Sequence, residues 1–210
     1  MSAVDRERWS VLILWLAAAL RKTIGMGGFV RLGYFAMEAS KMDGDLVEFG
    51  SWRGLTAMFM SVMSGKTAWI YDSFEGLPEP GPEDISNGNF FKSQFLCDEK
   101  EISQIFHEVQ LPAPIIHKAW FADLKPQDLP ERIAFAHLDG DFYESIKTSL
   151  SLVYPRMTTG GLCFIHDYAN PNLPGARKAV DEFMADKKER VAQMQDPFGD
   201  LSCHCMIQKL

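Results

Sequence analysis

Cysteine is scarce in this sequence, and its spacing fits no common metal or redox motif. Only four cysteines occur in 210 residues, and the two that lie close together, Cys203 and Cys205, are separated by one residue. Zinc knuckles and redox-active pairs usually place two residues between their cysteines. We therefore expect free thiols and a reducing, cytoplasmic location.

The sequence also lacks a basic stripe. Lys and Arg number 21 against 28 Asp and Glu, which gives a formal net charge of -7, and no run of Lys or Arg exceeds two residues. A nucleic-acid groove needs a row of cations that replaces the counterions condensed on the phosphates. This charge balance argues against a polynucleotide substrate and favours a small molecule.

The apolar run at residues 9–20 is too short to cross a bilayer. It holds about 12 residues, whereas a membrane span needs ~20. Asp5 and Glu7, just before the run, argue against a signal peptide. We expect a helix that is buried or contacts a second copy of the chain, and a membrane-surface anchor is the alternative.

Length and composition predict one folded domain. A chain of 210 residues fits the usual ~100–200 residues per domain, and a composition with 47% hydrophobic residues is too apolar for a disordered protein. We expect residues 1–44 to form N-terminal helices and residues 45–210 to form the sheet. Residues 79–97, within a long non-periodic stretch rich in proline and glycine, are a candidate lid, and a plain surface loop is the alternative.

Short β-rich runs alternate with helical patterns along the chain. We predict strands at residues 46–49, 68–71, 115–121, 133–138, 162–165 and 203–208, and helices at 9–22, 28–41, 55–63, 99–109, 145–154 and 175–188. Strands separated by helices indicate an α/β fold with a mostly parallel, twisted sheet covered on both faces. Ligands bind such sheets outside the carboxyl ends of the strands, so the residues that follow each strand are the candidates for a site.

A glycine turn follows the first predicted strand. Gly50 and Gly54 are spaced G-x-x-x-G, which differs from the dinucleotide pattern G-x-G-x-x-G, and no Walker lysine follows them. Asp72 ends the next strand about 20 residues later, where a carboxylate can accept hydrogen bonds from both ribose hydroxyls. A turn or helix cap is the alternative role for this residue.

A second cluster of polar residues ends two later strands. Asp139 and Asp141 follow one strand, and the pair His166 and Asp167 follows the next. Oxygen ligands suit Mg²⁺ or Ca²⁺, and a histidine among them admits Mn²⁺, Fe²⁺ or Zn²⁺. The alternative is that Asp139 and Asp167 cap turns while His137 points into the core.

Several sequence blocks together resemble the macrocin O-methyltransferase family. The blocks are VEFGxxxG at 47–54, YDSFEGLP at 71–78, HLDGDFYES at 137–145, GG at 160–161, HDY at 166–168 and PGARKAV at 174–180. The resemblance implies a Rossmann-like class I methyltransferase with an antiparallel last strand. It also implies transfer of a methyl group from S-adenosylmethionine to a hydroxyl, often on a sugar of a natural product, with Mg²⁺.

The resemblance also implies roles for individual residues. The residues placed around the cofactor are Glu48, Gly50, Ser51, Gly54 and Thr56 toward the methionine, Asp72 at the ribose, and Ser73, Phe74, Trp120 and Phe121 toward the adenine. Asp139 would lie near the transferred methyl group and would bind the metal, with Asp167 as a second ligand. Ala119 stands where the family tends to have glycine, which would narrow the adenine pocket.

One departure from the family pattern affects the expected metal site. The family usually reads Asp-Asp-Tyr where this chain reads His166-Asp167-Tyr168. One outcome is a metal held by Asp139, His166 and Asp167 with an altered preference. The other is a metal-independent enzyme in which His166 acts as general base beside Asp139, because its ordinary pKa of ~6.5 lies near operating pH.

Two other functional classes are compatible with this fold. An NAD-dependent reductase would need a tighter glycine fingerprint and a Tyr-x-x-x-Lys-like pair, which this sequence lacks. A non-catalytic S-adenosylmethionine-binding protein remains an alternative, since a histidine at position 166 is also compatible with a decayed site. For an enzyme we expect an acceptor with two adjacent oxygens, such as a sugar diol or catechol. We also expect a homodimer that completes the acceptor pocket.

Overall fold

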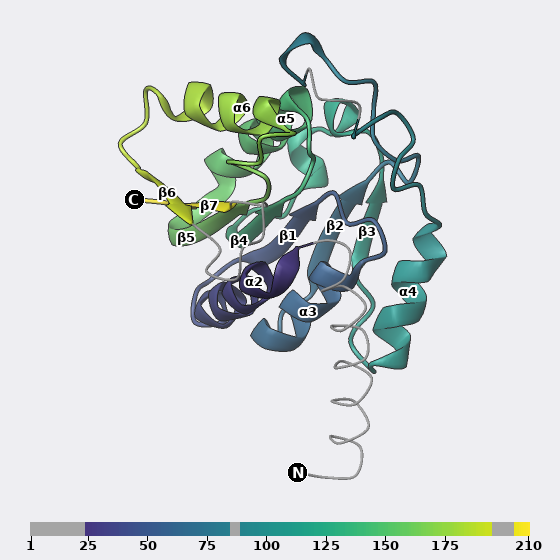
Figure 1. The fold of residues 1–210 in the computed structure, drawn as a ribbon. Coiled ribbons are helices and arrows are strands. Elements are labelled where there is room, and N and C mark those ends of the chain that lie inside the picture. The colour runs from purple at the N-terminus through teal and green to yellow at the C-terminus, as the bar shows by residue number, and fades with distance from the viewer. Residues whose placement is uncertain (1–23, 85–88, 195–203) are drawn as a thin grey trace.

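A single seven-stranded sheet forms the centre of the molecule (Figure 1). The computed structural model describes residues 24–84, 89–194 and 204–210. The strands are β1 (Asp45–Phe49), β2 (Ala68–Asp72), β3 (Ile115–Lys118), β4 (Ile133–Leu138), β5 (Met157–Ile165), β6 (Val191–Met194) and β7 (His204–Gln208), in the order β3-β2-β1-β4-β5-β7-β6. Strands β1 to β5 run parallel, and β7 runs antiparallel to both β5 and β6. This confirms the predicted mostly parallel sheet with an antiparallel last strand.

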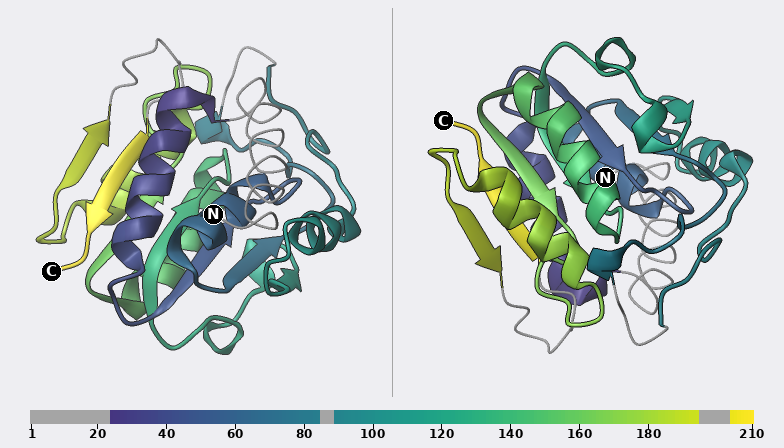
Figure 2. Two further views of the ribbon diagram at one scale, coloured as in Figure 1. Left: turned by 90° about the horizontal axis from the view of Figure 1, so that it is seen from below. Right: turned by 90° about the horizontal axis from the view of Figure 1, so that it is seen from above.

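Helices cover both faces of the sheet, as Figures 1 and 2 show. The helices are α2 (Gly25–Ala39), α3 (Leu55–Ser64) and α4 (Glu99–Glu108) on one face and α5 (Tyr143–Val153) and α6 (Pro174–Met184) on the other. Within the described residues, four short 3₁₀ helices lie in the connections, at Pro82–Asp84, Phe121–Asp123, Pro126–Asp128 and Tyr154–Arg156. Among the described residues, no helix is both long and apolar enough to cross a membrane.

Alternation along the strands divides the interior into two apolar layers. In β1, Leu46 packs under α2 and α3, whereas Val47 packs under α5 and α6. This period of two follows from the pleat, which sends successive side chains to opposite faces. Every residue of β4 is buried, and five of its six side chains are apolar, which fits a strand covered on both faces.

The predicted third strand is too long at its carboxyl end. We expected it to reach residue 121, but β3 ends at Lys118, which pairs with Asp72, the last residue of β2. After one further backbone hydrogen bond, from Ala119 N to Asp72 O at 3.0 Å, the chain turns into a 3₁₀ helix. Trp120 and Phe121 therefore lie in the connection that follows the strand.

Other predicted boundaries shift by several residues, and one strand was missed. Helix α2 runs from residue 25 to 39 instead of 28 to 41, α5 from 143 to 153 instead of 145 to 154, and α6 ends at 184 instead of 188; β5 begins at 157 instead of 162. Strand β6 was not predicted, because its four residues show no clear alternation of apolar and polar side chains. The predicted helix at 9–22 lies outside the described residues, as does residue 203 of the predicted last strand.

Candidate functional site

The glycine turn after β1 lies directly against the end of β4. Gly50 has φ +83°, and a Cβ atom there would lie 2.0 Å from the backbone oxygen of Asp139. Gly54 has φ +74° and precedes the first residue of α3. A left-handed backbone and this close approach both require glycine. The turn therefore brings the amino end of α3 next to Asp139, a member of the second polar cluster.

Asp72 joins the loops that follow β1 and β2. Its Oδ2 accepts hydrogen bonds from the backbone N–H groups of Ser51 at 2.8 Å and Trp52 at 3.1 Å, and its Oδ1 accepts one from Phe74 N at 2.8 Å. Burial raises the pKa of this carboxyl, although the three backbone donors oppose that shift. The carboxylate thus orders the glycine turn, which is close to the cap that sequence reasoning gave as its alternative role.

Glu48 lies inside the protein and is already bonded within the chain. It is fully buried, its Oε1 lies 2.8 Å from Nδ1 of His137, and its Oε2 accepts a hydrogen bond from Ser51 Oγ at 2.5 Å. Glu48 and His137 lie opposite each other on the neighbouring strands β1 and β4. The backbone of the turn is therefore the part that faces the candidate site, while Glu48 supports the turn from the protein interior through its hydrogen bond with Ser51.

Three more of the residues expected around the cofactor are mostly buried. Thr56 on α3 is 9% exposed, and Ser73 and Phe74 in the loop after β2 are 7% and 5% exposed. Ser73 Oγ donates a hydrogen bond to Gly76 O at 3.2 Å, which closes a turn in this loop. Phe121 is half-buried and meets the ring of Phe49 edge-on at 5.1 Å. The turn, this loop and the connection after β3 thus meet at one edge of the sheet.

Asp139, His166 and Asp167 converge after β4 and β5. Nδ1 of His166 lies 3.1 Å from Oδ1 of Asp139 and 2.5 Å from Oδ2 of Asp167. One ligand atom from each residue lies within 4.8 Å of the others, and no other such group occurs in the described part of the chain. Two carboxylates and one imidazole form a donor set that suits a divalent cation with mixed oxygen and nitrogen preference. The structure therefore brings together all three predicted metal ligands.

Charge coupling within this cluster is strong. Burial would lower the pKa of His166, but the carboxylates of Asp139 and Asp167 outweigh it and raise that pKa well above its ordinary value. Burial would likewise raise the pKa of Asp139, but the charge and hydrogen bond of His166 bring it below the ordinary value. The two carboxylates therefore favour the protonated form of the imidazole between them.

Asp141, which the sequence also places in this polar cluster, lies in the same region as a fourth titratable residue. It is 9% exposed, has a left-handed backbone with φ +57°, and its pKa is raised well above the ordinary value by burial and by the charges of Asp139 and Asp167. The repeated Asp-x-Asp spacing after a strand was the available sequence signal. A buried carboxyl with a raised pKa next to other carboxylates is typical of a functional site.

Buried histidines extend from the cluster under α2. His137 and His204 are fully buried, and the rings of His166 and His204 lie 4.7 Å apart. Burial, together with the neighbouring histidines, lowers the pKa of His204 to about 2, so that its ring is neutral. A Cβ atom at Gly28 of α2 would lie 2.6 Å from Nε2 of His204, which explains glycine there. Sequence reasoning missed His204, although its alternation with Met206 in β7 places both on the α2 face.

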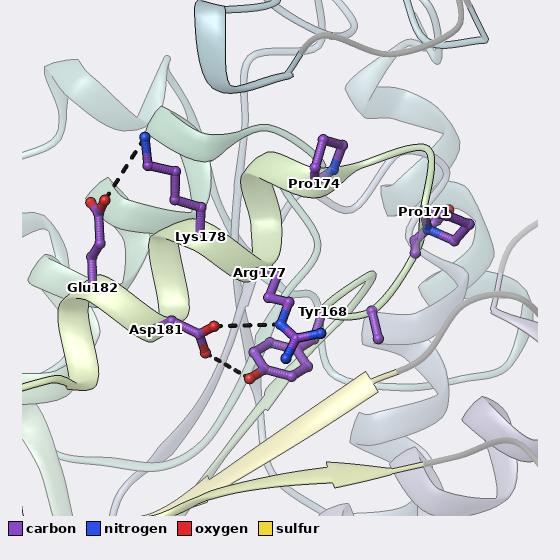
Figure 3. A pocket seen from close by; sticks show the side chains of 9 residues that line it. Tyr168, Pro171, Pro174, Arg177, Lys178, Asp181 and Glu182 are labelled. Carbon is purple, nitrogen blue, oxygen red and sulfur yellow. Dashed lines mark hydrogen bonds and ion pairs between the residues drawn. The ribbon is translucent and has the colours of Figure 1, made fainter.

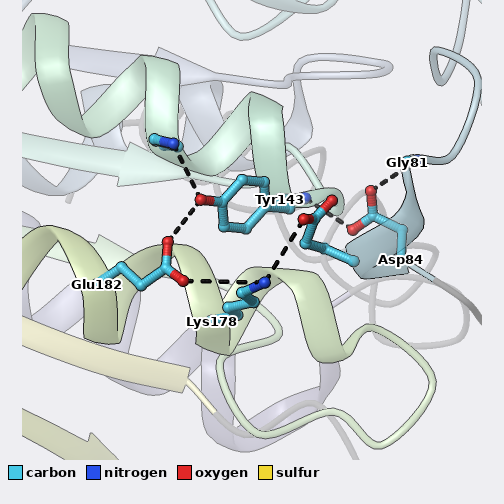
Figure 4. A network of polar contacts seen from close by, with 7 residues as sticks. Gly81, Asp84, Tyr143, Lys178 and Glu182 are labelled. Carbon is cyan, nitrogen blue, oxygen red and sulfur yellow. Dashed lines mark hydrogen bonds and ion pairs between the residues drawn. The ribbon is translucent and has the colours of Figure 1, made fainter.

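The candidate lid is anchored to α5 by Asp84 (Figure 4). Asp84 is 2% exposed, and its carboxylate accepts hydrogen bonds from Tyr143 N, the first residue of α5, at 2.8 Å and from Gly81 N at 3.0 Å. Phe90 and Phe95 from the same loop pack onto a small apolar cluster formed by Leu77, Phe142 and Leu173. Residues 85–88 of this loop lie outside the described residues.

A cavity of about 570 Å³ lies between α6 and the loop after β5 (Figure 3). Its lining includes Arg177, Lys178, Asp181 and Glu182 but neither Asp72 nor the metal-ligand candidates. The charges pair internally, with Arg177 Nε 3.4 Å from Asp181 and Lys178 Nζ 3.9 Å from Glu182. The cavity is therefore separate from the candidate site. Because these four charged side chains pair with one another, none of these pairs offers an unpaired charge that would recognise a ligand.

Comparisons with known proteins agree with the predicted family. The family model described as Macrocin-O-methyltransferase (TylF) matches residues 29–205. A Streptomyces niveus protein named demethyldecarbamoylnovobiocin O-methyltransferase is 30% identical over 159 residues, which cover 70% of this chain and 60% of that protein. A Streptomyces olivaceus protein named 8-demethyl-8-(2,3-dimethoxy-alpha-L-rhamnosyl)-tetracenomycin-C 4'-O-methyltransferase is 33% identical over 172 residues, which cover 69% and 59%. The chain thus spans about 60% of the length of these curated relatives.

Solved structures show the same architecture. The structure of the O-methyltransferase NovP superposes with a TM-score of 0.71 at 24% sequence identity, covering 89% of this chain and 81% of that one. Together with the strand order, this likeness confirms the predicted Rossmann-like class I methyltransferase fold.

Proposed function

Because the chain belongs to the macrocin O-methyltransferase family, we propose that it transfers a methyl group from S-adenosylmethionine to a hydroxyl of a small molecule. One observation carries the proposal: the Gly50 turn, the Asp72 carboxylate and the Asp139 cluster meet at the carboxyl ends of neighbouring strands. Strand order reverses between β1 and β4, and open α/β sheets bind their ligands at such a reversal.

The cofactor is assigned to the turn after β1 and the loop after β2. The backbone from Gly50 to Gly54 approaches the methionine part, and Asp72 exchanges at least one backbone hydrogen bond for the ribose hydroxyls. Phe74, Trp120 and Phe121 are assigned to the adenine side. This assignment is supported by the amino end of α3, because the backbone N–H groups of a helix's first turn attract a carboxylate such as that of the methionine part.

A divalent cation, Mg²⁺ or another, is assigned to Asp139, His166 and Asp167. Their donor atoms lie within 4.8 Å of one another, and the Asp139 side chain is 26% exposed, so the cluster opens toward the acceptor. When bound, the cation orients the acceptor and acidifies its hydroxyl. Asp139 itself holds the acceptor oxygen near the methyl group, and such alignment contributes up to ~7–11 kcal/mol in the best intramolecular cases.

The arrangement of His166 argues against its use as the general base. Its Nδ1 already contacts two carboxylates, which raise the pKa of the ring and favour its protonated form when no cation is present. A protonated imidazole has no lone pair with which to accept the hydroxyl proton.

The proposed acceptor is a sugar hydroxyl of a natural product, one of a pair of adjacent oxygens that would be able to chelate a cation held by the cluster. The Streptomyces olivaceus relative, whose name specifies 4'-O-methylation of a rhamnosyl compound, supports this class. Residues 79–97 are assigned to a lid that excludes water and contacts the acceptor. A homodimer that completes the acceptor pocket is part of the proposal.

A cytoplasmic location is also proposed for the protein. It is supported by the free thiols of Cys97, Cys163 and Cys205, all of them buried. Burial raises the pKa of each of these thiols, which keeps them in the unreactive protonated form.

Cofactor binding is the first test of the proposed function. We expect S-adenosylmethionine and its demethylated product to bind with micromolar Kd in calorimetric titration, and we expect Asp72→Ala to weaken binding at least tenfold. Asp98→Ala, which removes a carboxylate capping α4, serves as the matched control and retains wild-type affinity. The absence of both heat and a thermal shift with either compound contradicts the proposal.

Methyl transfer is then measured by mass spectrometry with labelled cofactor and a panel of glycosides and catechols. A labelled methyl ether on a glycoside is the expected product. Cofactor binding without transfer to any member of the panel favours the non-catalytic alternative.

A further inference from the structure

His166 places a ring nitrogen, which is a possible metal ligand, beside two carboxylates of this site. Its Nδ1 lies within 3.1 Å of an oxygen of Asp139 and 2.5 Å of an oxygen of Asp167. The other ring nitrogen, Nε2, is buried and has no hydrogen-bond partner in the described part of the chain. Because Nδ1 is the ring nitrogen that lies beside both carboxylates, it belongs to the same set of possible metal ligands as their oxygens.

Surrounding contacts hold this donor set in place. Asn170 Nδ2 donates a hydrogen bond to the second oxygen of Asp167, Oδ1, at 2.7 Å, which leaves Oδ2 for the imidazole or a cation. The His166 side chain is 8% exposed, and its ring packs against the buried ring of His204. A buried imidazole packed in this way has little freedom to turn Nδ1 away from the carboxylates.

The chemistry of the donors determines which ion the set prefers. Mg²⁺ favours oxygen ligands in near-ideal octahedral geometry, whereas imidazole nitrogen suits first-row transition metals. We propose that His166 Nδ1 is a direct ligand and shifts the preference of this site from Mg²⁺ to first-row transition-metal dications. The inference deepens the proposed function and rests on it, because it concerns the cation assigned to that same site.

Manganese is a suitable probe for this proposal. Among the first-row dications Mn²⁺ is the weakest binder in the general affinity order, so a preference for it over Mg²⁺ is a stringent test. We expect the wild-type protein to remove the free Mn²⁺ signal in electron paramagnetic resonance. We further expect electron spin-echo modulation from a ligated ¹⁴N nucleus, which changes to the ¹⁵N pattern when the histidines are ¹⁵N-labelled. This readout does not depend on enzyme activity.

The variant His166→Asp tests the proposed nitrogen ligand by removing it. It replaces the nitrogen with oxygen, so the histidine modulation disappears while Mn²⁺ still binds, and Mg²⁺ displaces Mn²⁺ at about tenfold lower concentration than in the wild type. His107→Asp, which makes the same exchange at an exposed position on α4, is the matched control and leaves both readouts unchanged. If His166→Asp does not fold, the isotope experiment on the wild-type protein still decides.

Three results overturn the proposal. The first is wild-type protein that binds no Mn²⁺ at millimolar concentration, as expected if His166 merely occupies the place of a cation. The second is bound Mn²⁺ without histidine modulation, and the third is displacement by Mg²⁺ that is equally easy in wild type and His166→Asp. Each of these leaves S-adenosylmethionine binding in calorimetry untouched, so failure of this inference is distinguishable from failure of the proposed function.

Discussion

At the scale of single residues, Gly50 is the position where the fold constrains the side chain most strongly. Both Gly50 and Gly65 have a left-handed backbone, with φ +83° and +70°, but only Gly50 meets an obstacle, the Asp139 carbonyl 2.0 Å from a built Cβ. We expect Gly65→Ala to lower the free energy of unfolding by ~1 kcal/mol through backbone strain alone. Gly50→Ala adds a backbone clash and should cost ~3 kcal/mol more. Urea unfolding measures both, and equal losses would show that the close approach is wrong.

The same scale shows which site residues a sequence can reveal. Asp72, Asp139 and His166 were predictable because Asp72 ends a strand and the other two directly follow one, and the carboxyl ends of parallel strands meet at one edge. Asp84 and His204 were not, because their partners come from distant parts of the chain: Asp84 caps a helix 59 residues later, and the His204 ring packs at a tilt against the ring of His166. Long-range contacts of this kind have no local pattern.

At the scale of elements, the loop between β2 and α4 depends on its anchor at Asp84. Two backbone N–H groups donate to this buried carboxylate, and charge-assisted hydrogen bonds contribute ~1.5–3 kcal/mol each. We therefore expect Asp84→Ala to speed proteolysis within residues 79–97 at least tenfold and to raise the KM for the acceptor more than it lowers kcat. Glu83→Ala, which loses only a partly exposed ion pair 3.5 Å long with Lys178, is the control and should be near wild type. An Asp84→Ala protein with wild-type proteolysis and KM would exclude the anchoring role.

The elements themselves were mostly predictable, and the errors occurred at their ends. The helix that begins at Tyr143 was expected two residues later, because its start is set by Asp84 from another loop and not by a local cap. The strand that we expected to reach residue 121 ends at Lys118, where its partner strand ends. Pairing partners and caps from elsewhere in the chain thus fix boundaries that local hydrophobic periodicity leaves open.

At the scale of the whole molecule, Glu189 connects the carboxyl-terminal end of the chain to the end of α5. Its carboxylate accepts hydrogen bonds from Lys209 Nζ at 2.8 Å, Tyr154 Oη at 2.6 Å and Leu210 N at 3.3 Å. The bonds from Lys209 and Tyr154 lower the pKa of Glu189 to about 2 from an ordinary value near 4.5. One ionised side chain therefore adds to the β5–β7 pairing in holding the antiparallel edge of the sheet against the core.

This connection predicts how stability changes in acid. Because the folded-state pKa lies below the unfolded value, the contribution of Glu189 is complete above about pH 5 and is lost as the pH falls toward 2. We expect Glu189→Gln to lower the free energy of unfolding by ~1 kcal/mol at pH 7, with a difference from wild type that shrinks steadily from pH 5 downward. Asp186→Asn, which alters an exposed ion pair with Lys187, is the control and should leave the urea midpoint unchanged across this range. A Glu189→Gln deficit that stayed constant from pH 7 to pH 3 would mean that packing, and not the charge of Glu189, holds the edge of the sheet in place.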